Sequence, residues 1–246
     1  MRHTFRFCSP QYGPRRRLGF LLLVNFAAVC LVKWLQGVPQ ELLWISHVGL
    51  LTSGAGFIFG SCLLPAATLI LILVSHAMWL ADFMLLGITG SSPWGITSYL
   101  AGAELLTWLG TIHHFYLLPL LMWHIRRVRL VPSEALPLAG ALYVWLTLTS
   151  YLMMAPIDNV NYAFAIFPQL DRPLIRAINA LPAFIYFPGM NLFMLFVIFT
   201  PSALMLRAWS AASARADTGG SPTGPPPGAG TFRAPKQKKP GSQARG

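Results

Sequence analysis

The chain is organised as six long apolar stretches, separated by shorter segments that hold most of its polar residues. A helix needs about 20 mostly apolar residues to cross the hydrocarbon core of a membrane. The pattern therefore predicts an all-α fold: a polytopic membrane helical bundle of about six transmembrane helices. The predicted spans are Leu18–Leu35, Glu41–Gly60, Cys62–Leu86, Ala103–Ile125, Ser133–Ala155 and Pro182–Leu206.

Two polar segments flank this transmembrane domain, which covers residues 18–207. Residues 1–17 form a basic N-terminus. No small-x-small cleavage site follows the first apolar run, which favours a retained helix over a cleaved signal peptide. Residues 208–246 are rich in Gly, Pro, Ser, Lys and Arg. Such a tail buries too little apolar surface to fold, so we predict that it is disordered.

Composition and charge placement set the class of protein and its orientation. With 55% apolar and only 10% charged residues, the chain cannot be a soluble globular domain, which carries about 25% charged residues. The net charge of +11 does not indicate nucleic-acid binding, because the basic residues gather at the ends of apolar segments. Of the 18 Lys and Arg residues, 5 precede residue 18, 3 lie at 126–129 and 7 lie from Arg207 onward. Basic segments stay in the cytoplasm, so we expect both termini to be cytoplasmic.

Ionisable side chains inside the predicted spans mark the candidate site, since such groups are costly in a membrane and are functional by default. All of the candidates but His124 fall in the outer half or near the middle of the bundle: His47, His76, Asp82 and Glu104 toward the outer side, and His113 and His114 near the middle of the fourth span. Five of the seven acidic residues lie in that half or in the outer loops. We therefore predict a water-accessible polar pocket that opens outward. The alternative is that these groups only hold neighbouring helices together.

Helical geometry ranks the candidates. Glu104, Thr107, Thr111 and His114 fall on one stripe about 80° wide if their span is one helix. His113 would then point about 100° away, so His114 is preferred for the pocket and His113 is the alternative. In the third span Ser75 and Asp82 share a face, with His76 beside it. His124 follows Trp123 at the cytoplasmic end and is interpreted as an interface anchor.

Known motifs offer little guidance. The chain has no H-E-x-x-H, G-x-S-x-G, P-loop or dinucleotide-binding pattern. It also has too few histidines for the boxes of a di-iron enzyme, so neither a metal nor a cofactor is expected. One lesser alternative is a haem between His47 and His113 or His114, because two histidines on different helices can ligate one haem. The Gly-rich stretch Gly54–Gly60 is interpreted as a site of close helix packing.

Four segments together resemble a known family: Leu42–Leu51 (LLWISHVGLL), Ser75–Gly87 (SHAMWLADFMLLG), Ile112–Trp123 (IHHFYLLPLLMW) and Tyr151–Phe164 (YLMMAPIDNVNYAF). They resemble an uncharacterised bacterial family of multi-pass "membrane-associated proteins". More remotely they resemble the YwaF-like integral membrane proteins and their ether-phospholipid acyltransferase relatives. The resemblance implies a bacterial inner-membrane location.

The resemblance also bears on individual residues. It implies roles for His113 or His114, for Asp82, and for Asn159 and Asn161 in the loop after the fifth span. The chain departs from the pattern at His47, where relatives resemble an Asp, and at Ser75–His76, where they resemble Pro-Glu. It also lacks a counterpart to the second-span Cys of the acyltransferase relatives, which puts a covalent acyl-Cys route in doubt.

Two functions follow as hypotheses. In the first, the chain modifies membrane lipids by acyl transfer or hydrolysis, with His114 or His113 as general base. Asp82 or Asp158 would orient that base, and Asn159 and Asn161 would stabilise an oxyanion. Further candidates at this site are His47, His76, Glu104 and Ser75. In the second, the chain is a non-enzymatic binding, assembly or transport-accessory protein. The expected partners are membrane lipids and not nucleic acid.

Overall fold

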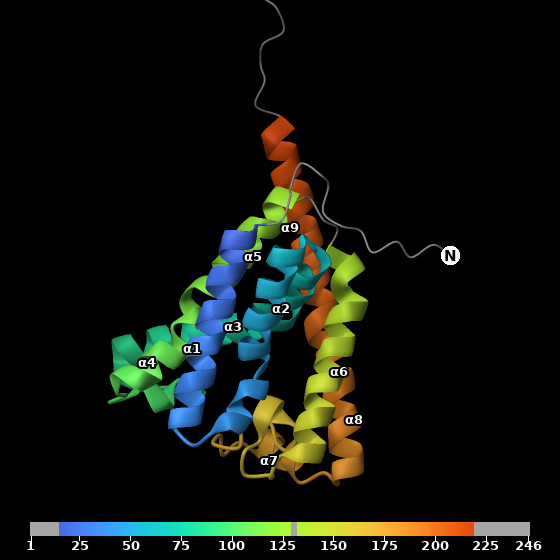
Figure 1. Cartoon of the computed structure of the whole chain (residues 1–246). Helices are drawn as coiled ribbons and strands as arrows, with labels where there is room; N and C mark the ends of the chain where they lie inside the picture. Colours follow the sequence, from blue (N-terminus) through green and yellow to red (C-terminus); the bar gives the residue numbers. More distant parts are fainter. Residues whose placement is uncertain (1–14, 129–131, 219–246) are drawn as a thin grey trace, which may run out of the picture.

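In a computed structural model of the chain, which describes residues 15–128 and 132–218, every regular element is a helix (Figure 1). This confirms the all-α prediction for the described part of the chain. The elements in chain order are α1 (Arg16–Leu35), η2 (Pro39–Leu43), α2 (Ile45–Phe59), α3 (Leu63–Thr89), η3 (Ser98–Leu100), α4 (Leu105–Thr111), α5 (His113–Val128), η4 (Pro132–Ala135), α6 (Leu136–Met153), η5 (Val160–Tyr162), α7 (Pro173–Asn179), α8 (Ala183–Phe193), η6 (Met194–Phe199) and α9 (Thr200–Thr218).

Five helical stretches among the described residues are long and apolar enough to cross a membrane. They coincide with the predicted first, third, fourth, fifth and sixth spans, and the set is that of a multi-pass membrane protein. Their bounds are Arg16–Leu35, Leu63–Thr89, Leu105–Arg127, Leu136–Met153 and Ala183–Ala212.

The predicted second span, Glu41–Gly60, is not one long helix. Its first part is the short 3₁₀ helix η2, and the chain turns at Trp44 before α2 runs for 15 residues. At 1.5 Å per residue α2 is about 22 Å long, less than the ~30 Å hydrocarbon core. Half of its residues are buried by neighbouring helices.

Two other predicted spans are divided. The fourth consists of α4 and α5, which meet at Ile112. The sixth consists of α8, the π-helix η6 and α9. Since α9 continues to Thr218, the prediction of disorder is wrong for residues 208–218. Residues 1–14 and 219–246 lie outside the described residues, and the predictions made for them stay predictions.

Helix α3 forms the centre of the core, with every residue from Pro65 to Leu73 buried. Glycines let other helices approach closely. A Cβ on Gly19 of α1 would lie 2.6 Å from the carbonyl oxygen of Gly54, and one on Gly56 would lie 2.6 Å from Pro65 Cδ. The predicted packing role of the Gly54–Gly60 stretch is thereby confirmed.

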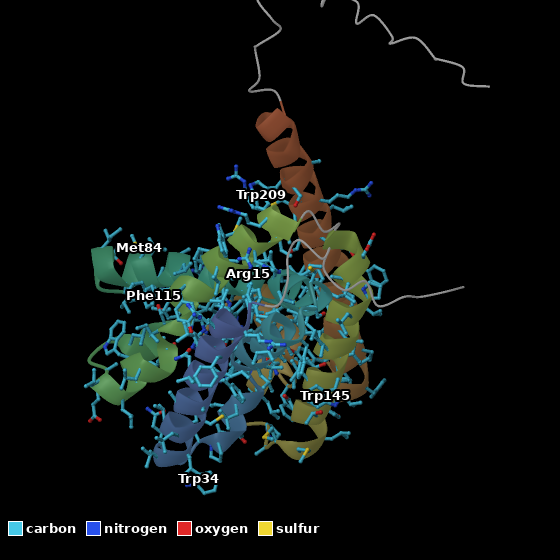
Figure 2. The ribbon with its side chains drawn as sticks, turned by 45° about the horizontal axis from the view of Figure 1, so that its top comes forward. Arg15, Trp34, Met84, Phe115, Trp145 and Trp209 are labelled. Carbon is cyan, nitrogen blue, oxygen red and sulfur yellow. The ribbon has the colours of Figure 1, made fainter. Side chains whose placement is uncertain are left out.

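The bundle has two distinct ends. Trp209 lies toward one end and Trp34 toward the other, as Figure 2 shows. We call the first the basic end, because α1 begins on that side and α5 ends there with Arg126 and Arg127. The opposite end carries the α1–α2 connection and α7 (Figure 1). Helix α4 and the end of α3, marked by Met84, stand out to one side.

Candidate functional site

Four histidines from three helices meet inside the bundle. The ring of His113 on α5 lies 5.2 Å from that of His47 on α2, 6.4 Å from that of His76 on α3 and 4.2 Å from that of His114. The His76 and His114 rings stack at 4.8 Å. The sequence placed these four side chains at similar depth, and the structure brings them together. We call them the histidine cluster.

The cluster is buried. His113 is 0% exposed, His76 1% and His47 4%, while His114 is half-buried. Among the described residues, Nε2 of His76 has no hydrogen-bond partner. The sequence ranked His114 above His113, but both belong to the cluster, and His113 is its most buried member.

The break between α4 and α5 fixes the tautomer of His114. In a continuous helix the amide of Phe115 would bond to the carbonyl of Thr111, but here it bonds to that of Ile112 at 3.2 Å. The Thr111 carbonyl instead accepts a 3.0 Å hydrogen bond from His114 Nδ1. Because a carbonyl only accepts, Nδ1 carries the proton and Nε2 keeps its lone pair. His47 is fixed in the same way, since its Nδ1 donates to the Glu41 carbonyl at 2.7 Å.

Aromatic side chains cover the half-buried face of His114. Trp79 stacks on the His114 ring at 4.5 Å and meets Phe115 edge-on at 5.3 Å. The indole N–H of Trp79 donates to the hydroxyl of Tyr99 at 3.1 Å, which also bonds to the Thr111 side chain. The sequence did not single out Tyr99, because it lies in the short 3₁₀ helix η3 and no local pattern links it to α3 or α5.

Asp82 does not orient a histidine. Its carboxylate is 0% exposed and accepts hydrogen bonds from the loop that follows α3. The donors are the backbone N–H of Trp94 at 3.0 Å, the backbone N–H and hydroxyl of Thr97, both at 2.8 Å, and the hydroxyl of Ser92. Asp82 therefore anchors the loop that carries Tyr99. It does not hydrogen-bond to the histidine that was predicted to act as general base.

Asp158 and the two asparagines of the α6–α7 connection also have hydrogen-bond partners, in their own loop and in the segment that leads into α2. Asp158 accepts from the Gln40 side chain at 3.0 Å and from the Ala155 N–H at 3.2 Å. Asn159 bonds to backbone groups of its own loop through its oxygen and its nitrogen. Asn161 accepts from Ile45 N–H at 2.9 Å and donates to the Leu43 carbonyl at 2.8 Å. The Asn161 amide thus satisfies backbone groups beside α2 and the Asn159 amide satisfies its own loop, so the structure does not offer either as an oxyanion donor.

The same loop is held by aromatic contacts. The Tyr162 ring meets Trp44 edge-on at 5.9 Å, and its carbonyl accepts from the Tyr186 hydroxyl at 2.9 Å. Burial, with a smaller contribution from the Asp82 charge, raises the pKa of Tyr162 to about 12. The Tyr162 phenol therefore stays neutral at physiological pH.

The remaining predicted residues lie apart from the cluster. Glu104 is exposed at the start of α4, and Ser75 is exposed with its hydroxyl bonded to the Ile72 carbonyl at 3.2 Å. The single stripe predicted for Glu104 and His114 assumed one continuous helix, which the break at Ile112 removes. His124 is not an interface anchor: it is buried, and its ring packs edge-on against Phe57 at 4.6 Å.

The described residues do not favour a metal or a haem. No group of three or more His, Cys, Asp or Glu side chains in residues 15–128 and 132–218 is arranged to hold a metal ion. A haem between His47 and His113 does not fit, because their rings are 5.2 Å apart and tilted by 59°, with His114 packed directly against His113. This leaves no slot for a macrocycle.

Comparison with protein-family models, curated proteins and solved structures finds no match to this chain. Its function is therefore inferred from its own residues.

Proposed function

We propose that the chain is a multi-pass protein of a bacterial inner membrane that hydrolyses or transfers ester-linked acyl chains of membrane lipids at the histidine cluster. The observation that carries this proposal is the hydrogen bond from His114 Nδ1–H to the Thr111 carbonyl. That bond leaves Nε2 as a base on a half-buried ring at the edge of an aromatic surface.

The proposed topology has six crossings, with α2 as a short second crossing and both termini in the cytoplasm. It is supported by the positive-inside rule, because 15 of the 18 basic residues then lie on the cytoplasmic side. It also places η2, η5 and α7 on the outer side. The cluster then lies between the two faces, where an ionisable group is costly unless it has a function.

A lipid can reach His114 from the side of the bundle. Next to it, Leu109 and Ile112 are each 49% exposed and Phe115 is 37% exposed. In a membrane these side chains face lipid, so an acyl chain can lie along them with its ester near the His114 ring. The apolar surface supplies binding, and the buried histidines supply a low-dielectric setting for charge development.

The proposed reaction uses His114 as base and then as acid. Nε2 takes a proton from water as the water oxygen adds to the ester carbonyl carbon. The carbon–oxygen ester bond then breaks, and the departing alcohol oxygen takes that proton from His114, giving a fatty acid and an alcohol. A lipid hydroxyl in place of water gives acyl transfer. The Tyr99 hydroxyl, held by Trp79, donates to the carbonyl oxygen as negative charge develops.

The second candidate function is assembly or binding without catalysis. It is favoured by a specific observation: the buried Asp82 and Asn161 are fully engaged in holding loops to the bundle. Under this reading the histidine cluster joins α2, α3 and α5 and has no substrate. The two functions predict different results for a conservative substitution of His114: only the enzymatic function predicts a change in membrane lipids.

The test uses a bacterial strain that naturally makes this protein. The gene is deleted, and the wild-type protein or a variant is then expressed in the deletion strain. His114→Gln is compared with His124→Gln, a matched control because His124 is a buried histidine on the same helix, outside the cluster. The deletion should change the amount of one lipid class, and the wild-type chain should return it to normal. We expect His114→Gln to fail to return it to normal although the variant protein is as abundant as the wild type. His124→Gln should restore it. Unchanged lipids in the deletion strain and in both variants would remove the enzymatic proposal.

A further inference from the structure

A second candidate site lies at the basic end of the bundle, away from the histidine cluster. A shallow, open cavity of about 650 Å³ lies there between the start of α1 and the second half of α5. Three of its six lining residues are consecutive arginines and the other three are apolar or aromatic: Arg15, Arg16, Arg17, Leu18, Leu120 and Trp123. A cavity with this lining is suited to a ligand that has both an anionic and an apolar part.

Two helices contribute the positive charge. The guanidinium of Arg15 lies 4.4 Å from the centroid of the Trp123 ring, and that of Arg127 lies 5.4 Å from it. Stacking on an aromatic ring orients a guanidinium. Trp123 therefore orients two guanidinium groups next to the exposed Arg16 and Arg17, which line the cavity with it.

The surface next to the cavity is apolar. One turn along α1 from Arg16 and Arg17, Phe20 is 64% exposed and Leu21 is 63% exposed. A ligand seated against the arginines can thus continue as a hydrocarbon chain along α1. Phosphate is the anion that guanidinium groups bind best in bidentate geometry.

From this arrangement we propose that the cavity binds the phosphate headgroup of an anionic phospholipid, with the acyl chains lying along Phe20 and Leu21. Free phosphate would use the same arginines but gains nothing from the apolar surface. Basic pockets between transmembrane helices bind anionic headgroups for these reasons. The site depends on neither the histidine cluster nor the proposed reaction.

The test measures lipid retention by native mass spectrometry of the full chain taken from vesicles of phosphatidylcholine with a minority of phosphatidylglycerol. The wild type should retain phosphatidylglycerol selectively. Each arginine near the surface contributes roughly 1 kcal/mol to the binding of an anionic lipid. Arg16→Gln or Arg17→Gln alone should therefore lower the selectivity about fivefold, and the double variant should lower it about 30-fold. Trp123→Leu, which keeps the net charge, should also lower it.

Arg207→Gln is the matched control, because it removes one exposed charge from α9, which does not line the cavity. Its selectivity should change less than twofold. An equal loss in Arg17→Gln and Arg207→Gln would overturn the proposal, since it indicates diffuse attraction to the surface. Thermal stabilisation by inorganic phosphate in phosphatidylcholine vesicles, equal to that given by phosphatidylglycerol, would also overturn the lipid assignment.

Discussion

Replacement of Asp82 by Ala tests whether this residue anchors a loop. The carboxylate is fully buried and accepts from two backbone N–H groups, those of Trp94 and Thr97. In Asp82→Ala both donors lose their acceptor, and the Thr97 side chain, itself 0% exposed, cannot turn to water. A buried donor without a partner costs about 1–3 kcal/mol, so we expect the two donors together to lower the free energy of unfolding by about 2–6 kcal/mol.

Asp82→Asn refines the same prediction. It keeps the volume and one acceptor oxygen, but its amide nitrogen faces N–H donors, so we expect an intermediate loss of about 1–3 kcal/mol. The control is Asp171→Asn, which removes an exposed ion pair of 3.2 Å with Arg176. Such a pair contributes about 0–1 kcal/mol.

The assay is equilibrium unfolding in mixed micelles, combined with limited proteolysis of residues 90–100. Asp82→Ala should make that loop cleavable under conditions that leave the wild type intact. The anchoring argument is mistaken if Asp82→Ala and the Asp171→Asn control have the same free energy of unfolding within error and protease does not cut residues 90–100.

Three further predictions concern helix packing and the α6–α7 loop. Gly19→Ala places a methyl group 2.6 Å from the Gly54 carbonyl oxygen, so micelle unfolding should show a loss of about 1–3 kcal/mol; its control Gly87→Ala, with open space around the new methyl, should be neutral or stabilised by up to about 1 kcal/mol. Asn161→Ala removes the bonds to Ile45 and Leu43 and should cost about 2–3 kcal/mol in the same assay. Asn161→Gly accommodates the φ of 55°, so it should be about 1 kcal/mol more stable than the Ala variant; the reverse order would contradict the backbone argument.

Much of the fold could be predicted from the apolar pattern, since each span of the lipid-facing bundle needs a long apolar run. The exceptions are elements that protein covers. Helix α2 begins only at Ile45. Asn161 hydrogen-bonds to the backbone of Leu43 and Ile45 on either side of Trp44. A contact between residues more than a hundred positions apart cannot be predicted from the local sequence.

The site was predicted in part. The cost of burying ionisable groups identified the four histidines, and the structure brings them together. The same reasoning placed Asp82 beside them, but its carboxylate turns to its own loop. Burial alone cannot tell a group that acts on a ligand from one that satisfies backbone N–H groups. The break at Ile112, which frees the Thr111 carbonyl for His114, left no clear signal in the sequence.

The measurement that tests the central claim most directly is lipid ester turnover by the purified chain. Wild type, His114→Gln, His124→Gln and Tyr99→Phe are reconstituted in phospholipid vesicles, and released fatty acid and transferred acyl chains are quantified. We predict turnover by the wild type and by His124→Gln. Turnover should fall about 100-fold or more in His114→Gln and by a smaller factor in Tyr99→Phe. Equal turnover in the His114→Gln and His124→Gln proteins would contradict the assignment of the histidine cluster as the functional centre.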